Sequence, residues 1–512
     1  MIVKTHGCAV FGVNATIVTV ETDIGKGSYF FLVGLPDSAV KESHQRVSAA
    51  IKNIGLHMPR GREITVNLAP ADIRKEGSAY DLPIAIGIIA ASGQLDSGRL
   101  GELVIMGELA LDGAVRPIKG ALPIALEAKR QGFKGVIVPS ANAREAAIVH
   151  GIEVHGVDHL QQVVGFLQGT LPLPPTVVDI HAEFDRRSRD HGVDLSDVKG
   201  QENIKRAFEI AAAGGHNVIL IGPPGAGKTM MAKRLPTILP PLNIDEALET
   251  TKIHSVAGKL RQDDALLSVR PFRSPHHTIS DIALVGGGSF PQPGEISLAH
   301  NGVLFLDELP EFKRTVLEVM RQPLEDRVVT ISRAKFSVEY PASFMLVAAM
   351  NPCPCGYYNH PEKECVCAPG VVQKYLNRIS GPLLDRIDIH IEVTPVAFSE
   401  LSSERLTEKS ADIRDRVITA RKVQEERYVG RPIHCNAQMG TQELRTICRI
   451  GADGQALLQK AMECLGLSAR AYDRILKVAR TIADLAGSPE IQTGHLAEAI
   501  QYRSLDREGW AG

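Results

Sequence analysis

Short apolar runs and amphipathic runs alternate along the first third of the chain. Continuous or alternating apolar residues predict β-strands, whereas apolar positions three or four residues apart predict helices. The predicted strands are "ATIVTVETDI", "SYFFLVGL", "EITVNLA" and "GVIVP", and the predicted helices are "SAVKESHQRVSAAIKN", "LPIAIGIIAASGQL" and one from Ala121. The run "VIMGELALDGAVRPI" predicts a hairpin that turns at Asp112 and Gly113. Residues 1–170 are therefore expected to form one mixed α/β domain.

A proline-rich segment follows this first domain. Three prolines in "TLPLPPT" favour a stiff, extended chain, and the charged stretch "HAEFDRRSRDHG" comes next. We expect a linker over 171–195, a second α/β domain over 196–395 and a helical domain over 396–512, where the apolar spacing becomes helical.

Composition limits the partners of the protein. A chain of 512 residues is long enough for several domains, and its 57 Lys plus Arg nearly balance its 59 Asp plus Glu, so contacts with nucleic acid would have to come from local loops. No apolar run reaches the ~20 residues that cross a bilayer, and the N-terminus alternates like a strand rather than a signal peptide. Four of the eight cysteines cluster between Cys353 and Cys367, which favours a reducing cytoplasm over a disulfide framework.

The segment "GPPGAGKT" predicts a phosphate-binding loop. Its glycines allow backbone N–H groups to wrap phosphates, Lys228 is placed to reach the β- and γ-phosphates, and the Thr229 hydroxyl to bind Mg²⁺. The apolar run "NVILI" before it and a helical pattern after it provide the expected context. The predicted ATP-binding residues are Gly222, Pro223, Pro224, Gly225, Ala226, Gly227, Lys228 and Thr229.

Polar residues follow two further apolar runs. In "GVLFLDEL", Asp307 is expected to bind Mg²⁺ and Glu308 to polarise the attacking water. Asn351 ends "FMLVAAMNP", where its amide could orient that water near the γ-phosphate. The alternatives are an ordinary solvated turn for the two acids and a turn residue for the asparagine.

These segments occur in the order found in AAA+ ATPases of the magnesium-chelatase-like and MCM-like branch. The phosphate loop, "LFLDE", Asn351, "GPLLDRID" and "SARAYDR" carry the resemblance. It implies that Arg386 acts as a trans finger in the neighbouring subunit's ATP site and that Arg470 is the second sensor. A finger in trans implies a ring, expected to be a hexamer. Without the resemblance, Arg378, Arg386 and Arg470 would be interpreted as surface groups.

Two segments are candidates for contact with DNA. The irregular "RPFRSPHHTISDIALVGGGSFPQPGEISLAHNG" resembles a chelatase-type insertion, in which Arg273, His276 and His277 could contact phosphates or a partner. Adjacent histidines rarely point at one metal ion, so a structural role for the pair is the alternative. "RVVTISRAKFSVEYP" predicts a hairpin with Arg333 and Lys335 near its tip, resembling the pore hairpin of MCM-type motors. A solvated turn is the alternative.

The cysteine cluster has the spacing of two C-x-C pairs. Cys353, Cys355, Cys365 and Cys367 could together bind structural Zn²⁺ tetrahedrally, with His360 as a substitute ligand. The C-x₂-C spacing is more usual, so a reduced cysteine-rich loop is the alternative.

The first domain resembles the proteolytic domain of Lon, which has a ribosomal-S5-like fold. "RKEGSAYDLPIAIGIIAASG" and the segment after "VRPI" carry the similarity, and the Lon nucleophile matches Ser78. The catalytic lysine of Lon falls on Leu122, and Lys119 lies three positions early. Because a Ser–Lys dyad requires an amine, this domain is expected to be non-proteolytic.

Over nearly its whole length, the chain resembles the ComM/YifB family. The resemblance implies an S5/Lon-like α+β domain, an AAA+ core with a parallel sheet and helices, and a helical lid. It also implies a cytoplasmic hexameric ATPase that uses ATP and Mg²⁺ and drives branch migration of single-stranded or branched DNA during natural transformation, with recombination proteins as further partners. A chelatase-type motor, an ATP-dependent protease and a protein-remodelling ATPase remain alternatives.

Overall fold

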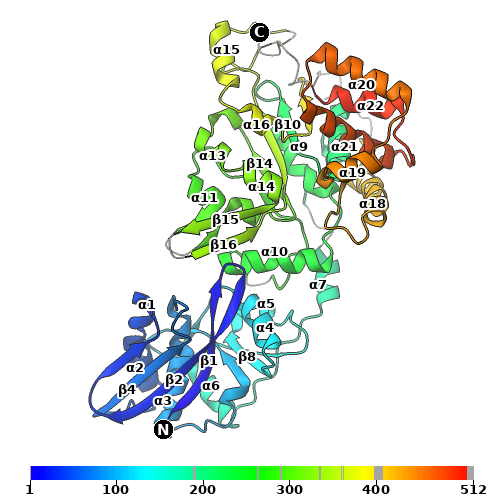
Figure 1. The fold of residues 1–512 in the computed structure, drawn as a ribbon. Coiled ribbons are helices and arrows are strands. Elements are labelled where there is room, and N and C mark those ends of the chain that lie inside the picture. The colour runs from blue at the N-terminus through cyan, green and yellow to red at the C-terminus, as the bar shows by residue number, and fades with distance from the viewer. Residues whose placement is uncertain are drawn as a thin grey trace.

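The computed structural model describes residues 2–187, 192–261, 264–288, 291–333, 336–358, 360, 362–396 and 407–503. Figure 1 shows the N-terminal domain, in blue to cyan, beside a central domain in green and yellow, with the orange and red C-terminal helices packed against the central domain. Every described helix is too short or too polar to cross a bilayer.

The N-terminal domain is built on a mixed sheet with the strand order β3-β4-β2-β1-β5-β8-β9. Its strands are β1 (Val3–Phe11), β2 (Asn14–Lys26), β3 (Phe30–Val33), β4 (Arg62–Ala69), β5 (Leu103–Ile105), β8 (Gly135–Pro139) and β9 (Glu153–Val157). Its helices are α1 (Ser38–Lys41), α2 (Ser43–Asn53), α3 (Asp81–Ala91), α4 (Ala121–Arg130), α5 (Ser140–Ala146) and α6 (Leu160–Leu167). The α/β prediction for this domain is confirmed.

Two local predictions in this domain are also confirmed. Leu109 of β6 (Glu108–Leu109) pairs with Val115 of β7 (Val115–Arg116), so the hairpin turns where Asp112 and Gly113 were expected to turn it. Helix α3 is apolar on all sides and buried along nearly its whole length, as a helix in the centre of a core must be.

The proline-rich segment differs in part from the extended linker that was expected. Thr176 donates from its backbone N–H to Val154 O at 2.7 Å, and Val178 and Ile180 are buried in the core of the N-terminal domain. The charged stretch begins with α7 (Ile180–Arg187). Because Val178 and Ile180 are anchored in the core, a helix forms where the charged sequence alone predicted an extended linker.

The central domain is a parallel sheet with the strand order β11-β14-β17-β10-β18. Its strands are β10 (Val218–Ile221), β11 (Phe272–Arg273), β14 (Val303–Leu306), β17 (Met345–Met350) and β18 (Ile389–Glu392). Its helices include α8 (Glu202–Gly214), α9 (Lys228–Arg234), α10 (Ile244–Ala257), α13 (Arg314–Glu318), α14 (Arg321–Asp326), α15 (Pro369–Leu376) and α16 (Gly381–Leu384).

Alternate residues of these strands enter two different cores, because side chains alternate across a sheet. Val218 and Leu220 pack with α8 and the C-terminal helices, whereas Ile219 and Ile221 pack on the opposite face with α13 and α15. Both faces are therefore covered, and functional side chains are exposed chiefly at the ends of the strands.

The C-terminal region is helical, as expected. Its described helices are α18 (Ser410–Arg427), α19 (Thr441–Ile447), α20 (Ala452–Leu465), α21 (Ala469–Leu485) and α22 (Thr493–Gln501). Residues of α18 and α21 belong to the same hydrophobic core as α8, so this lid is packed directly on the central domain.

The insertion before β14 is irregular, as its sequence predicts. It contains α11 (Asp281–Val285), the short pair β12 (Gly286–Gly287) and β13 (Gln292–Pro293), and α12 (Glu295–Leu298). The predicted second hairpin is formed by β15 (Val328–Arg333) and β16 (Phe336–Pro341), in which Arg333 pairs with Phe336. Lys335 and the side chain of Arg333 lie outside the described residues.

Among the described residues, the contacts of the N-terminal domain with the central domain include α10 and the hairpin of β15 and β16. Gly120, at the start of α4, donates to Ser255 O of α10 at 3.1 Å, and α10 lies between the two domains in Figure 1. At the tip of the β1–β2 hairpin, Val13 packs on the core beneath β15 and β16. The N-terminal domain thus contacts the hairpin that carries Arg333, where a Cβ on Gly12 would lie 2.8 Å from Cγ1 of Val338.

Candidate nucleotide site

The phosphate loop lies between β10 and α9, at the carboxyl end of β10, which is paired with β17 and β18. Gly225 and Gly227 have φ values of +79° and +84°, a region that residues with a Cβ rarely adopt. A Cβ on Gly222 would lie 2.3 Å from Val393 O, so close packing against the end of β18 requires glycine there. The remaining predicted loop residues, Pro223, Pro224 and Ala226, complete this turn.

Lys228 is buried at the start of α9 and contacts the loop that precedes it. Its Nζ donates to Gly222 O at 2.7 Å, to Pro223 O at 2.9 Å and to Asn351 Oδ1 at 3.0 Å. Burial lowers the pKa of Lys228, while the charges of Asp307 and Glu308 oppose that shift. The predicted lysine and the predicted asparagine therefore meet at one point.

Sheet order explains this meeting. Leu306 is level with Ala348 and Ile221 with Met350, so β14, β17 and β10 end side by side. Asp307, Asn351 and Gly222 follow these three strands directly, and the carboxyl ends of parallel strands share one edge.

Thr229 and Asp307 form the predicted magnesium pair. The Thr229 hydroxyl donates to Asp307 Oδ2 at 2.6 Å, although the residues are far apart in sequence. Hydroxyl and carboxylate oxygens are hard ligands of the kind that Mg²⁺ prefers beside substrate phosphates. The oxygens of Thr229 and Asp307 would therefore suit Mg²⁺ beside a bound nucleotide.

Glu308 occupies an unusual backbone conformation beside this pair. Its φ is +52°, a left-handed conformation that costs a non-glycine residue ~1–3 kcal/mol and is often found at functional sites. Its carboxylate is 56% exposed, and Oε2 lies 3.3 Å from Nδ1 of His277. A carboxylate that is open to solvent next to a phosphate loop can act as a general base.

His277 is a residue whose position sequence reasoning missed. Its ring packs on that of His276 with centroids 4.1 Å apart, and it reaches Glu308 from the insertion. His277 was expected to contact phosphate or a partner, and within the chain the structure places it beside the carboxylate of Glu308. No local sequence signal links two residues on separate elements.

We expect His277→Ala to raise basal ATP turnover by up to about fivefold with little change in KM, because an exposed side-chain contact of this kind contributes up to ~1 kcal/mol to holding Glu308 in its present position. Steady-state kinetics of His277→Ala beside the control His276→Ala would measure this. A lower kcat in His277→Ala alone would show that the histidine assists hydrolysis rather than restraining it.

Arg386 and Arg470 lie together near the amino ends of the parallel strands, opposite the carboxyl ends that carry the phosphate loop. Arg470 Nη1 pairs with Asp385 Oδ2 at 3.0 Å, and Arg386 is 6% exposed and paired with Glu325. Asn217, which precedes β10, donates from its side chain to Arg386 O at 3.0 Å. The length of β10, ~13 Å for its four residues, therefore separates these arginines from the phosphate loop of the same chain.

The pocket around these arginines joins the lid to the core. Arg474 of α21 pairs with buried Asp388 at 3.0 Å. Burial opposes ionisation of Asp388, but Arg474 and His216 hold its pKa well below the usual range. Burial, together with the charge of Arg474, lowers the pKa of Lys477 to about 8. The lining residues are Glu325, Asp385, Arg386, Arg470, Asp473, Arg474 and Lys477.

Other predicted cations are paired within the chain. Arg273 makes two hydrogen bonds to the carboxylate of Glu295, at 2.6 and 2.7 Å. Arg378 pairs with Glu311 at 3.0 Å. Arg273 would have to exchange a bidentate partner to bind a phosphate.

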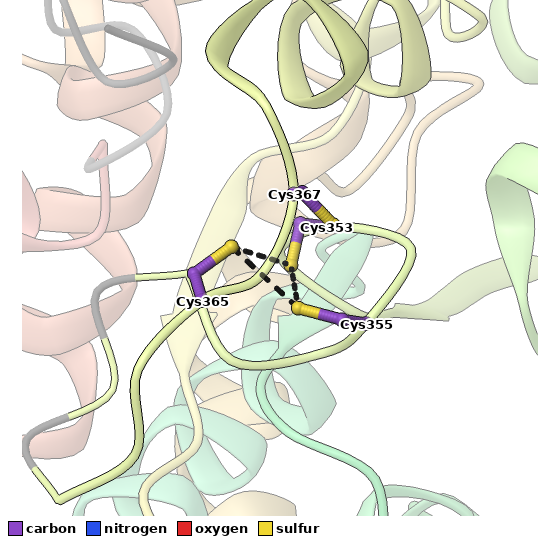
Figure 2. Close-up of side chains that lie close together, drawn as sticks. All are labelled: Cys353, Cys355, Cys365 and Cys367. Atoms are coloured by element: carbon purple, nitrogen blue, oxygen red, sulfur yellow. Dashed lines mark hydrogen bonds between the residues drawn. The ribbon is translucent and has the colours of Figure 1, made fainter.

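The four clustered cysteines converge on one point. Their Sγ atoms all lie within 4.8 Å of one another, and Figure 2 shows three of them joined by short contacts. His360 is not part of this group: its Nδ1 accepts from the backbone N–H groups of Glu362 and Lys363, at 3.0 and 3.1 Å. The four cysteines thus converge without His360, whose Nδ1 caps a turn, and the substitute-ligand hypothesis stays a prediction.

Ser78, which matches the nucleophile of Lon, has a carboxylate as its partner rather than an amine. The Ser78 hydroxyl donates to Glu108, and Leu122 is fully buried in α4. The side chain of Lys119 lies against Gly258 at the end of α10, so this amine belongs to the contact between the domains.

The strand–loop–helix with Lys228 and Thr229, the acidic pair after β14 and Asn351 after β17 define a P-loop ATPase of the AAA+ class. The chain matches family profiles described as magnesium chelatase, subunit ChlI, over residues 194–401, subunit ChlI of Mg-chelatase over 20–142, and the ChlI C-terminal region over 407–503. The chain belongs to the ComM/YifB family of magnesium-chelatase-like AAA+ proteins, which confirms the predicted resemblance.

Full-length relatives carry the family assignment. YifB of Escherichia coli K12 is 47% identical, and the competence protein ComM of Haemophilus influenzae is 46% identical; each alignment covers 98% of this chain and 97% of the relative. Lon protease 2 of Bacillus subtilis is 31% identical over 34% of this chain and 30% of its own length.

Proposed function

We propose that this protein is an ATP-driven ring motor that acts on DNA and promotes branch migration during the recombination of incoming single strands in natural transformation. The positions of Arg386 and Arg470 carry the proposal. They lie near the amino ends of the parallel strands, whereas the phosphate loop of their own chain lies at the carboxyl end. They therefore serve ATP hydrolysis only if a neighbouring subunit presents its loop to them.

The geometry and the family resemblance support the following catalytic roles. Lys228 and the loop amides bind the β- and γ-phosphates, and Thr229 and Asp307 hold Mg²⁺. Glu308 takes a proton from the attacking water, and Asn351, already hydrogen-bonded to Lys228, orients that water at the γ-phosphate. Arg386 of one subunit stabilises the charge that develops on the nucleotide of the next, and Arg470 senses that nucleotide.

The DNA substrate is supported by the family and by the two basic residues that the sequence places at the turn of the β15–β16 hairpin. The relative in Haemophilus influenzae is a competence protein. Six hairpins that each carry Arg333 and Lys335 would line a ring with positive charge suited to a phosphate backbone. The insertion, with Arg273 and His276, is a second candidate contact. Recombination proteins are the expected partners, and the cytoplasm is the expected location.

Hydrolysis and assembly together test the proposal. We expect single-stranded and branched DNA to raise ATP turnover several-fold, and ATP to shift the protein from small species to a ring in sizing experiments. Added salt should weaken the stimulation, because phosphate contacts release counterions. A protomer that hydrolyses ATP equally fast alone and without DNA would refute the proposal. Stimulation by a protein partner instead of DNA would favour a chelatase-type or remodelling ATPase.

We also propose that Cys353, Cys355, Cys365 and Cys367 hold a structural Zn²⁺. Four thiolates fill a tetrahedral zinc site and leave no open position for chemistry. The ion would therefore shape the loop after β17, rather than activate a water.

A further inference from the structure

The sulfur positions match the geometry of a tetrahedral zinc site. With Zn–S bonds of ~2.3 Å, the sulfurs of such a site lie about 3.8 Å apart. The Sγ of Cys353 lies 3.2 Å from that of Cys355 and 3.6 Å from that of Cys365, and the Cys355–Cys365 separation is 3.5 Å. Figure 2 shows that the two pairs approach from separate arms of one loop.

The backbone around the cysteines is arranged as in a metal knuckle. The backbone amides of Tyr357 and Val366 lie near the sulfur of Cys355, and the amide of Cys367 lies near the sulfur of Cys365. Amide donors to sulfur stabilise metal-bound thiolates and fix their orientation. These amides are therefore close enough to support thiolates that bind a metal.

This knuckle, residues 353–367, also contacts the nucleotide site. Asn351, whose side chain accepts from Lys228, lies two residues before Cys353, and Cys353 is fully buried. Gly356 has φ +86°, and a Cβ there would lie 2.4 Å from Cδ of Pro224. The backbone at Gly356, directly after Cys355, therefore packs on Pro224 of the phosphate loop.

The chain that leaves the knuckle after Cys367 leads toward the pocket that contains Arg386 and Arg470. Cys367 is followed by α15, and the chain then runs through α16 to Arg386. A metal that ties Cys365 and Cys367 to Cys353 and Cys355 would close this loop and restrict both of its ends. Without the ion, Asn351 and Pro224 would lose the rigid neighbour that they contact.

We propose that the zinc knuckle is a positioning element of the ATP site: the ion holds Asn351 and the phosphate loop in the arrangement that hydrolysis requires, so turnover depends on zinc occupancy. The proposal rests on the proposed ATPase function and adds a metal dependence to it.

The test compares the full-length protein with Cys365→Ser/Cys367→Ser, which leaves buried Cys353 intact. Elemental analysis should find about one zinc per chain in the parent and little in the variant. We expect kcat to fall about 10- to 100-fold, the range for loss of a metal-supporting shell, with a cooperative thermal transition retained. Cys464→Ser, at an exposed cysteine of α20, is the matched control and should keep both zinc and turnover.

A second variant separates the contact from the metal. Gly356→Ala should retain zinc but reduce kcat, because its Cβ would collide with Pro224. A parent protein purified without zinc would overturn the metal site. Zinc loss at unchanged turnover would overturn the coupling and leave the ATPase assignment standing, whereas a zinc-loaded parent with no ATPase activity would instead remove the proposed function.

Discussion

Arg386→Ala protein is expected to bind ATP as the parent does and to hydrolyse it about 10³-fold more slowly or worse, the range found for arginine fingers. The physical reason is that guanidinium stays ionised and donates through a planar fork to the charge that develops on the transferred phosphoryl group. Nucleotide affinity should be unchanged, because the phosphate loop of the same chain lies at the opposite end of β10 from Arg386.

Mixing two inactive proteins tests whether the finger acts in trans. Lys228→Ala protein should lose nucleotide binding but still present Arg386. In mixed rings, some interfaces combine an intact loop from one subunit with an intact Arg386 from the next, so partial turnover should return. The absence of rescue at every mixing ratio would contradict the trans role.

A structural explanation of the Arg386→Ala defect has its own control. Arg386 pairs with Glu325, whose side chain is 55% exposed, so Glu325→Gln removes the charge pair while leaving the arginine. A comparable loss of hydrolysis in Glu325→Gln would mean that the ion pair, rather than a contact with the neighbouring nucleotide, accounts for the effect.

Glu308→Gln is the second change with a large expected effect. We expect tight ATP binding with hydrolysis reduced about 10²- to 10⁴-fold, because the amide keeps the shape of the side chain but cannot accept the proton of the attacking water. ATP-bound rings should therefore accumulate. Single-turnover hydrolysis, nucleotide-binding titration and sizing would measure the three parts of this expectation.

Glu311→Gln is the matched control for Glu308→Gln. Glu311 follows on the same turn and is an exposed partner of Arg378, so its substitution should change turnover little. If Glu308→Gln turned over at the parent rate, the general base would have to be another group.

Several features followed from local sequence. The phosphate loop needs closely spaced glycines, a lysine and a threonine, so its chemistry is visible within eight residues, and the structure places the glycines between β10 and α9 and the lysine and threonine at the start of α9. Apolar periodicity likewise predicted the strands and the helical C-terminus, because alternation and 3.6-residue spacing reflect how each element buries one face. Charge was a weaker guide, since α7 forms in a stretch that was expected to be an extended linker.

The chain alone thus determined which chemical groups are present and the type of most elements, because both depend on neighbours a few residues apart. Only the tertiary structure decided which groups meet: Asn351 with Lys228, His277 with Glu308, and Arg386 with Glu325. These pairings depend on strand order and on the path of the insertion, which bring together residues far apart along the chain. Packing between distant segments also decided that His360 caps a turn while four sulfurs converge beside the phosphate loop.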